Sequence, residues 1–156
     1  MTNKIILLIS LLSYAIIVSQ SFMYLLTLKN VHFSLDAIPY TEIRKLIDTS
    51  MRVNFKYVIY IALLFNILLV VLNIKNPGSL LFITATIALF ALVIDTLLML
   101  KGNLPINDII NTWTSESFPA NWAEYRMKWF NIFQYRQIAN ITGFVSLLLG
   151  AVFGVK

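Results

Sequence analysis

Four long apolar runs constrain the fold of this chain more than any other feature. They cover residues 4–28, 53–74, 79–100 and 131–155 of a sequence of 156 residues. Each run holds about the 20 residues that an α-helix needs to cross the hydrocarbon core of a bilayer. A helix also satisfies its own backbone hydrogen bonds, as lipid requires. The sequence therefore predicts an all-α fold, in which residues 1–156 form one transmembrane four-helix bundle.

The composition agrees with a location in lipid and excludes a soluble globular domain. Apolar residues make up 59% of the chain, charged residues make up 12%, and the mean hydropathy is +0.80. The short basic start of the first run is similar to that of a secretory signal. Residues 22–26 continue the run past any plausible cleavage point, so we interpret it as the first spanning helix.

The connections between the runs define the two ends of the bundle. Residues 75–78, Lys-Asn-Pro-Gly, form a turn signal that is too short for anything but an antiparallel hairpin between the second and third helices. Four crossings then place Met1 and Lys156 on the same side of the membrane. The two longer connections, residues 29–52 and 101–128, lie on the opposite side, which we call the loop face.

Helical signals continue into both of these longer connections. Pro39 can open a helix that reaches Ile74, and Pro119 can open one that runs into the fourth span. We therefore expect helices two and four to extend beyond the bilayer on the loop face. A short amphipathic helix is predicted over residues 105–113, lying across this end of the bundle as a roof. Its apolar stripe consists of Ile106, Ile109, Ile110 and Trp113.

The distribution of charge leaves two orientations open. Eight of the Lys and Arg residues fall at the loop face and three at the other face, a count that places the loop face in the cytoplasm. The three lie in very short segments, however, whereas the eight are spread through longer segments that hold six of the seven acidic residues. The density of Lys and Arg along the connecting segments therefore favours the opposite orientation, with the loop face outside the cytoplasm. We expect a multi-pass protein of the bacterial cytoplasmic membrane, with membrane lipids as partners.

Residue types that are absent or rare exclude several functions. The chain has no cysteine and one histidine, His32, so disulfides, thiolate clusters, multi-histidine metal sites and a haem held by two histidines are excluded. We expect no cofactor. The basic residues are scattered despite a net charge of +5, which does not predict nucleic-acid binding. His32 is interpreted as a loop residue; as the only imidazole, it is also an alternative general base or lone metal ligand.

Polar residues inside the spans are costly in lipid and therefore informative. Asp95 of the third helix and Arg136 of the fourth lie at similar depth below the loop face, so we expect them to pair. Gln20 and Tyr24 reach the same level, and Asn140 lies deeper. Together they predict a polar-floored pocket that opens toward the loops. The alternative is a purely structural role, in which the ion pair locks the helices and the asparagine bonds between them.

The segment between the third and fourth spans carries a recognisable pattern. It contains an Asn-x-Pro-x-Asn motif ending at Asn107, a tryptophan, a Pro-x-x-Trp and an Arg-x-x-Trp motif, and an arginine that begins the last span. This pattern resembles the anthrone oxygenase family of small four-span membrane proteins, most of which have no assigned function. Some members are implicated in oxidising an anthrone to an anthraquinone with no familiar redox cofactor. The histidine that the family often has before this arginine is absent from residues 129–135.

The resemblance implies roles for particular residues. Such an oxidation needs a base, donors that hold the resulting anion, and an apolar aromatic pocket. Asp95 would be the base, Arg126, Arg136 and Asn107 the donors, and the pocket would include the three tryptophans, Trp113, Trp122 and Trp129. Two functions remain open. One is an oxygenase-like enzyme (an oxidoreductase) acting on a flat hydrophobic molecule; the other is a non-catalytic membrane protein that binds a lipid-like molecule or has an accessory or structural role. A transporter is disfavoured because the sequence has no internal repeat.

Overall fold

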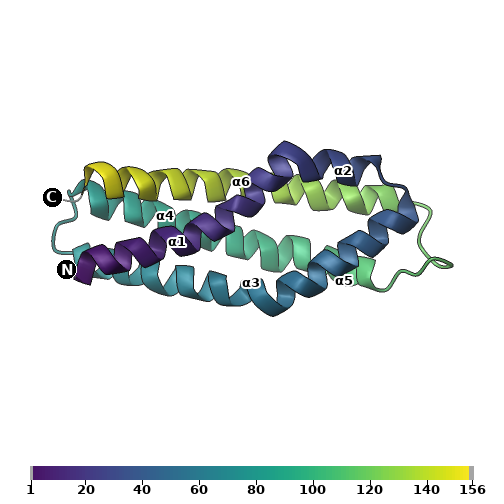
Figure 1. Ribbon diagram of the computed structural model, residues 1–156, viewed down its shortest axis with the longest axis horizontal. Coiled ribbons are helices and arrows are strands. Elements are labelled where there is room, and N and C mark those ends of the chain that lie inside the picture. Colours follow the sequence, from purple (N-terminus) through teal and green to yellow (C-terminus); the bar gives the residue numbers. More distant parts are fainter. Residues whose placement is uncertain (1, 155–156) are drawn as a thin grey trace.

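The computed structural model describes residues 2–154, and all regular structure in that range is helical (Figure 1). The first long helix comprises α1 (Thr2–Met23), a π-helical turn η1 (Tyr24–Leu28) and α2 (Lys29–Ser34). The second is α3 (Ala37–Asn73). The third comprises α4 (Leu80–Leu98), a second π-helical turn η2 (Met99–Asn103) and α5 (Leu104–Asn111), and the fourth is α6 (Trp122–Phe153).

The helices pack as an antiparallel bundle with simple up-and-down connections. α1 packs against α3 and α6, and α4 packs against the same two helices. The start of α1, the end of α6 and the turn between α3 and α4 lie at one end of the molecule, as Figure 1 shows. The predicted common side for Met1 and Lys156 concerns two positions that lie outside the described residues.

All four long helices are long and apolar enough to cross a membrane. They are Asn3–Ser34, Ala37–Asn73, Leu80–Asn111 and Trp122–Phe153. Many large apolar side chains on their outer surfaces are exposed, as lipid-facing positions require. The predicted fold, an all-α integral membrane four-helix bundle, is confirmed.

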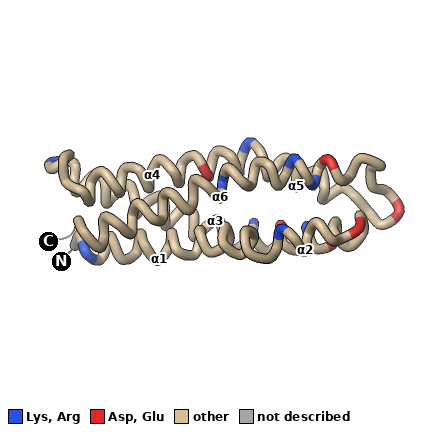
Figure 2. The backbone as a smooth tube through the Cα atoms, turned by 90° about the horizontal axis from the view of Figure 1, so that it is seen from above, with Lys and Arg blue, Asp and Glu red and all other residues tan. Residues whose placement is uncertain are grey.

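The position of the charges marks the part of the bundle that suits the hydrocarbon core. Residues 5–28, 57–74, 79–94 and 137–154 contain no Lys, Arg, Asp or Glu. Figure 2 shows the consequence: apart from the far end, the charged residues gather in the loop-face half of the molecule. Lys56, Asp95 and Arg136 are the first charged residues met on leaving this charge-free part toward the loop face along their helices. They therefore approximate the level at which the hydrocarbon core gives way to lipid headgroups.

The helices extend further on the loop face than the sequence predicts. α3 has 37 residues and α6 has 32, so the expected extension of helices two and four is present. The first and third long helices also have 32 residues each. At 1.5 Å per residue these helices are about 48–55 Å long, against about 30 Å for the hydrocarbon core.

The helix expected to roof the bundle is instead a continuation of the third span. α5 follows α4 through η2 without a break and lies beside α3. Pro105 does not interrupt this helix because it directly follows the wide turn, where the α-helical hydrogen-bond pattern has already been replaced. The expected short helix is present as Leu104–Asn111, but its expected position as a roof across the bundle is wrong.

Small residues bring α4 and α6 into close contact in the charge-free part. Ala88 and Ala91 of α4 are buried, and Ala91 lies opposite Gly143 of α6. The hydroxyl of Tyr14 donates a hydrogen bond to the carbonyl of Ala88 at 3.3 Å and fills the space beside Gly143, where a Cβ would overlap it. Close backbone approach at small residues is a common packing mode of membrane helices.

Candidate functional site

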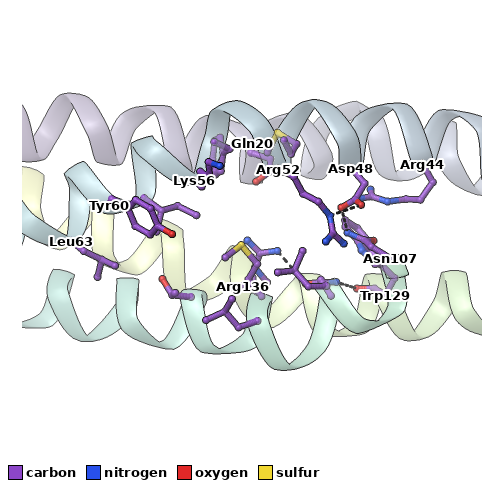
Figure 3. A pocket seen from close by; sticks show the side chains of 18 residues that line it. Gln20, Arg44, Asp48, Arg52, Lys56, Tyr60, Leu63, Asn107, Trp129 and Arg136 are labelled. Atoms are coloured by element: carbon purple, nitrogen blue, oxygen red, sulfur yellow. Dashed lines mark hydrogen bonds and ion pairs between the residues drawn. The ribbon is translucent and has the colours of Figure 1, made fainter. Parts of the chain in front are cut away.

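A cavity of about 310 Å³ lies between α3 and the third long helix (Figure 3). α3 contributes lining residues from Arg44 to Leu63, and the third helix contributes residues from Thr96 to Asn107. Gln20 of α1 and two residues of α6 complete the wall. The cavity spans the level at which the charge-free part of the bundle ends, so one part of it is apolar and the other is polar.

The α3 wall is a single face of one helix. Its charged members and Tyr60 recur every four residues, which places successive members one above another. They are Arg44, Asp48, Arg52, Lys56 and Tyr60. The third helix presents asparagines with the same spacing, at 103, 107 and 111, and the first two of these also line the cavity. The cavity is therefore bounded by a charged face and an amide face.

Asp48 joins these two faces at the loop-face end of the cavity. Its carboxylate accepts hydrogen bonds from Asn107 Nδ2 at 2.7 Å, Asn111 Nδ2 at 2.8 Å and Arg52 Nε at 2.7 Å. Arg52 also bonds Asp108 of α5 at 2.6 Å. We call this set of contacts the Asp48 clasp. It ties α3 to α5 across the loop-face end of the cavity (Figure 3).

The open side of the cavity faces outward between α3 and the third helix. Tyr60 and Leu100 belong to its wall and are 63% and 48% exposed. Both lie on the outer surface of the bundle, one on each side of the gap. We expected a pocket that opens toward the loops; the exposed lining residues instead lie at its side, whereas Arg44, Asn107 and Trp129 near the loop-face end are 4%, 4% and 2% exposed.

The predicted contact between Asp95 and Arg136 is confirmed. Arg136 Nε donates to Asp95 Oδ1 at 2.7 Å, and the two side chains are 6% and 1% exposed. Arg136 lines the cavity, whereas Asp95 lies behind it. Asn103 of η2 joins the third helix to α6 at two further points, since its Oδ1 accepts from Arg136 Nη1 at 3.2 Å and its Nδ2 donates to the carbonyl of Trp129 at 2.9 Å.

Arg44 is a buried cation with an aromatic support. Its Cζ lies 4.1 Å from the ring centroid of Trp129, and its Nη1 donates to the hydroxyl of Tyr24 at 3.0 Å. The residue is 4% exposed, yet no carboxylate of the described residues lies within 4.0 Å of its nitrogens. Within the same range of residues, Arg44 Nε and Trp129 Nε1 are buried and have no hydrogen-bond partner.

His32 is part of a helix and not of a loop. It lies in α2, because the first long helix continues to Ser34, and it is 1% exposed. Its ring stacks on Tyr24 at 5.6 Å and meets the edges of Tyr40 and Phe130. The interpretation of His32 as a loop residue is therefore wrong, and the imidazole is not part of the cavity wall.

The cavity wall includes four of the residues that the sequence singled out for a site: Gln20, Asn107, Trp129 and Arg136. The others lie elsewhere. Tyr24 supports Arg44 from outside the cavity wall, and Asn140 is buried deeper in the bundle.

Three further predicted residues hold the loop-face end together. Arg126 donates to the carbonyls of His32 and Leu35 at 3.0 and 2.9 Å, which fixes the end of α2 against α6. Trp122 lies under its guanidinium, 4.6 Å from ring centroid to Cζ. Trp113 packs edge-on against Tyr125. In this structure all three contact protein groups outside the cavity.

The sequence contained a signal for the α3 wall that was not recognised. Arg44, Asp48, Arg52 and Lys56 follow one another at intervals of four residues directly before an apolar span. Taken singly, each has the character of a charged residue near a membrane surface. Taken together, they form a polar stripe along one helix, which indicates a buried or cavity-lining face.

Comparisons with known proteins give no identification: no family model, no curated protein and no solved structure matches the chain. The resemblance to the anthrone oxygenase family therefore stays a prediction. Among the described residues, no group of three or more Asp, Glu or His side chains is placed so that it could hold a metal ion.

Proposed function

We propose that this protein binds a lipid-like or flat hydrophobic small molecule, which reaches the cavity sideways from the bilayer. The observation that carries this proposal is the lateral opening between Tyr60 and Leu100 of a cavity whose loop-face end is crossed by the Asp48 clasp. A molecule dissolved in the membrane meets this opening directly. A bacterial cytoplasmic membrane, the location expected from the sequence, is part of the proposal.

The lining supports a ligand with an extended apolar part. Phe55, Ile59 and Leu63 of α3 face Met99 and Leu100 of the third helix. A volume of about 310 Å³ lies at the lower end of the range of about 300–1,000 Å³ that is typical of small-molecule pockets. Ligand pockets are mostly apolar, with a few polar groups that fix orientation, and this cavity has the same division.

The direct test fills the cavity without changing the surface. Leu63→Trp places an indole in the wall, and Leu64→Trp is the matched control because Leu64 is 53% exposed and outside the lining. Both proteins are purified in a mild detergent, and the molecules that co-purify are quantified by mass spectrometry. We expect one class of small molecule to be lost in Leu63→Trp and retained in Leu64→Trp. Equal amounts in both variants would contradict binding in this cavity.

An anthrone-oxygenase-like activity is a second candidate, favoured by one observation. Four residues of the family-like segment, Asn103, Asn107, Trp129 and Arg136, meet at the cavity. The reaction would convert the methylene of an anthrone to a carbonyl, with O₂ as oxidant and water as the second product. The expected bases, Asp95 and His32, are not in the wall.

Asp48 is a carboxylate that does line the cavity, but it already accepts three hydrogen bonds. We therefore place binding before catalysis in the proposal. Oxygen uptake by the purified protein with an anthrone separates the two candidates. Uptake that is abolished by Leu63→Trp and retained in Leu64→Trp would favour the enzyme.

A further inference from the structure

We propose that the molecule bound in this cavity is an anionic amphiphile, whose carboxylate or phosphate head group binds at Arg44 and Trp129. This inference rests on the proposed binding function and adds the chemical class of the ligand. The apolar part of the ligand lies along Ile59 and Leu63, in the charge-free half of the bundle.

The first observation is the charge of Arg44. A guanidinium that is 4% exposed has lost most of its hydration, and buried charges in proteins are normally paired with an opposite charge. Arg44 has a tyrosine hydroxyl and an indole face but no carboxylate within 4.0 Å in the described part of the chain. An anion in the adjoining cavity would provide the missing partner.

The second observation concerns hydrogen-bond donors. Arg44 Nε and Trp129 Nε1 belong to neighbouring side chains in the wall, and both are buried donors without an acceptor among residues 2–154. An oxyacid head group supplies two or more acceptor oxygens, which suits a pair of donors. The neighbouring Asn107 has its amide orientation fixed, because Nδ2 donates to a carboxylate that can only accept. Its Oδ1 has no partner in the described structure and can accept from a hydroxyl or from the protonated form of a head group.

The net charge of the wall and its ion-pair partners is positive. The lining contains the cations Arg44, Arg52, Lys56 and Arg136 and the carboxylate Asp48. Arg136 is paired with Asp95, and Arg52 is paired with Asp48 and Asp108. The two arginines and three carboxylates of these ion pairs together carry a charge of −1. Arg44 and Lys56 are the two remaining cations of the wall, and adding them gives a total of +1. Lys56 lies twelve residues from Arg44, about 18 Å along the helix. It is therefore too far away to bind the same head group, and it lies near the lateral opening instead.

The position of this receptor along the bundle fits an amphiphile. Arg44 lies on the loop-face side of the level marked by Lys56 and Arg136, whereas Leu63 lies in the charge-free part. A molecule with its head group at the Arg44 guanidinium and Trp129, and its chain pointing toward Leu63, has the same orientation as the lipids around it. It can therefore pass from the bilayer into the cavity without turning over.

The test compares two probes that differ only in the head group. Oleate and oleyl alcohol have the same chain, and their apparent Kd values are measured by isothermal titration calorimetry on the full chain in a neutral detergent. We expect oleate to bind at least about tenfold more tightly, since a hydrogen bond to a charged group contributes enough for a factor of ten or more. A second pair, dioleoyl phosphatidylglycerol and dioleoyl phosphatidylcholine in mixed micelles, separates a membrane phospholipid from a free single-chain amphiphile as the source of the head group.

Variants locate the effect. Arg44→Gln should remove the preference for the anionic probe and leave the affinity for oleyl alcohol within about twofold. Lys101→Gln is the matched control, because it removes the same charge from an exposed position in η2 outside the lining. Trp129→Phe removes one N–H donor and keeps an aromatic ring, and it should reduce the preference several-fold. If Arg44→Gln does not fold, Trp129→Phe alone tests whether the head group binds at this site.

The outcomes distinguish this inference from the proposed function. If both probes of each pair bind equally and Leu63→Trp blocks them, the cavity binds ligands but the anionic head group is wrong. A preference that survives Arg44→Gln, or survives Trp129→Phe when Arg44→Gln cannot be purified, overturns the head-group site. If no probe binds, or if Leu63→Trp leaves binding unchanged, the proposed function itself fails. An Arg44-dependent preference in either pair supports the inference and identifies the source.

Discussion

Replacing Asp95 with asparagine removes the carboxylate from a contact that is almost completely shielded from water. The two side chains of the pair are 1% and 6% exposed, and Arg136 Nε lies 2.7 Å from Asp95 Oδ1. The substitution leaves a buried guanidinium with neutral side-chain acceptors only, which are the amide oxygens of Asn103 and of the introduced asparagine. Removing one member of a buried ion pair costs about 3–5 kcal/mol. Because these neutral oxygens still accept from Arg136, we expect the free energy of unfolding to fall by about 3 kcal/mol, the lower end of this range.

The double variant is the informative one. Arg136→Gln alone leaves a buried carboxylate, so it should destabilise the protein at least as much as Asp95→Asn. Replacing both residues removes both charges, and the loss should be smaller than the sum of the single losses by about 2 kcal/mol or more. For a chain of this length, a loss of about 3 kcal/mol corresponds to a decrease in Tm of about 6–12 °C.

The assay is thermal unfolding in detergent of the wild type, the two single variants and the double variant. Lys101→Gln serves as a control for the loss of one exposed charge, and it should change Tm by less than about 2 °C. If the single effects add to within about 0.5 kcal/mol, the two residues are not energetically coupled. That result would refute the reasoning from burial and contact distance.

Three further predictions concern the packing, the Asp48 clasp and the topology. Gly143→Ala should destabilise the bundle by about 1–3 kcal/mol, because its Cβ would overlap a buried tyrosine hydroxyl, whereas Gly78→Ala meets no atom within 4 Å and should unfold at the wild-type temperature. Asp48→Asn should loosen α5 from α3, seen as faster amide hydrogen exchange over residues 104–111; unchanged exchange would contradict the clasp. Single cysteines introduced at Asn76 and Ser115 should be labelled from opposite sides of the membrane, and labelling from one side would disprove the four-span topology.

Depth along the helices was enough to predict the central ion pair from the sequence. Asp95 and Arg136 each lie where a charge-free stretch ends, and a single pair of opposite charges at one level has few other ways to satisfy itself. The same reasoning did not find Arg44. The four-residue spacing of Arg44 with the charges at 48, 52 and 56 marks a common helix face. A charge outside the apolar spans can be solvated, however, so this spacing alone does not show whether the arginine is buried against an indole or faces water. That difference arises only when α6 brings Trp129 to α3.

Continuity of the helices was the other feature that the sequence did not predict. Pro105 and Gly102 favour a break after the third span, and the apolar stripe from Ile106 to Trp113 favours a new helix with its own direction. The structure has neither a break nor a new direction at this point, because the π-helical turn accommodates the proline and the helix axis continues from α4 into α5. The turn ends at Asn103, which is 1% exposed and bonds both Arg136 and the Trp129 carbonyl. These partners belong to another helix, so local sequence does not reveal them.

The turn η2 sets the direction in which the side chains of α5 point around the helix axis, relative to those of α4. At about 100° per residue, a regular α-helix would place Asn103 about 80° around the axis from Asp95. One extra residue in the wide turn reduces this angle to about 20°, so the side chains of Asp95 and Asn103 both meet Arg136. The angle between Asp95 and Asn107 falls in the same way, from about 120° to about 20°. Compared with a regular α-helix, the turn is equivalent to the insertion of one residue. Deleting a single residue between 99 and 103 would rotate α5 by about 100° and move its asparagines away from Asp48, so related chains should be aligned with this position allowed as a gap.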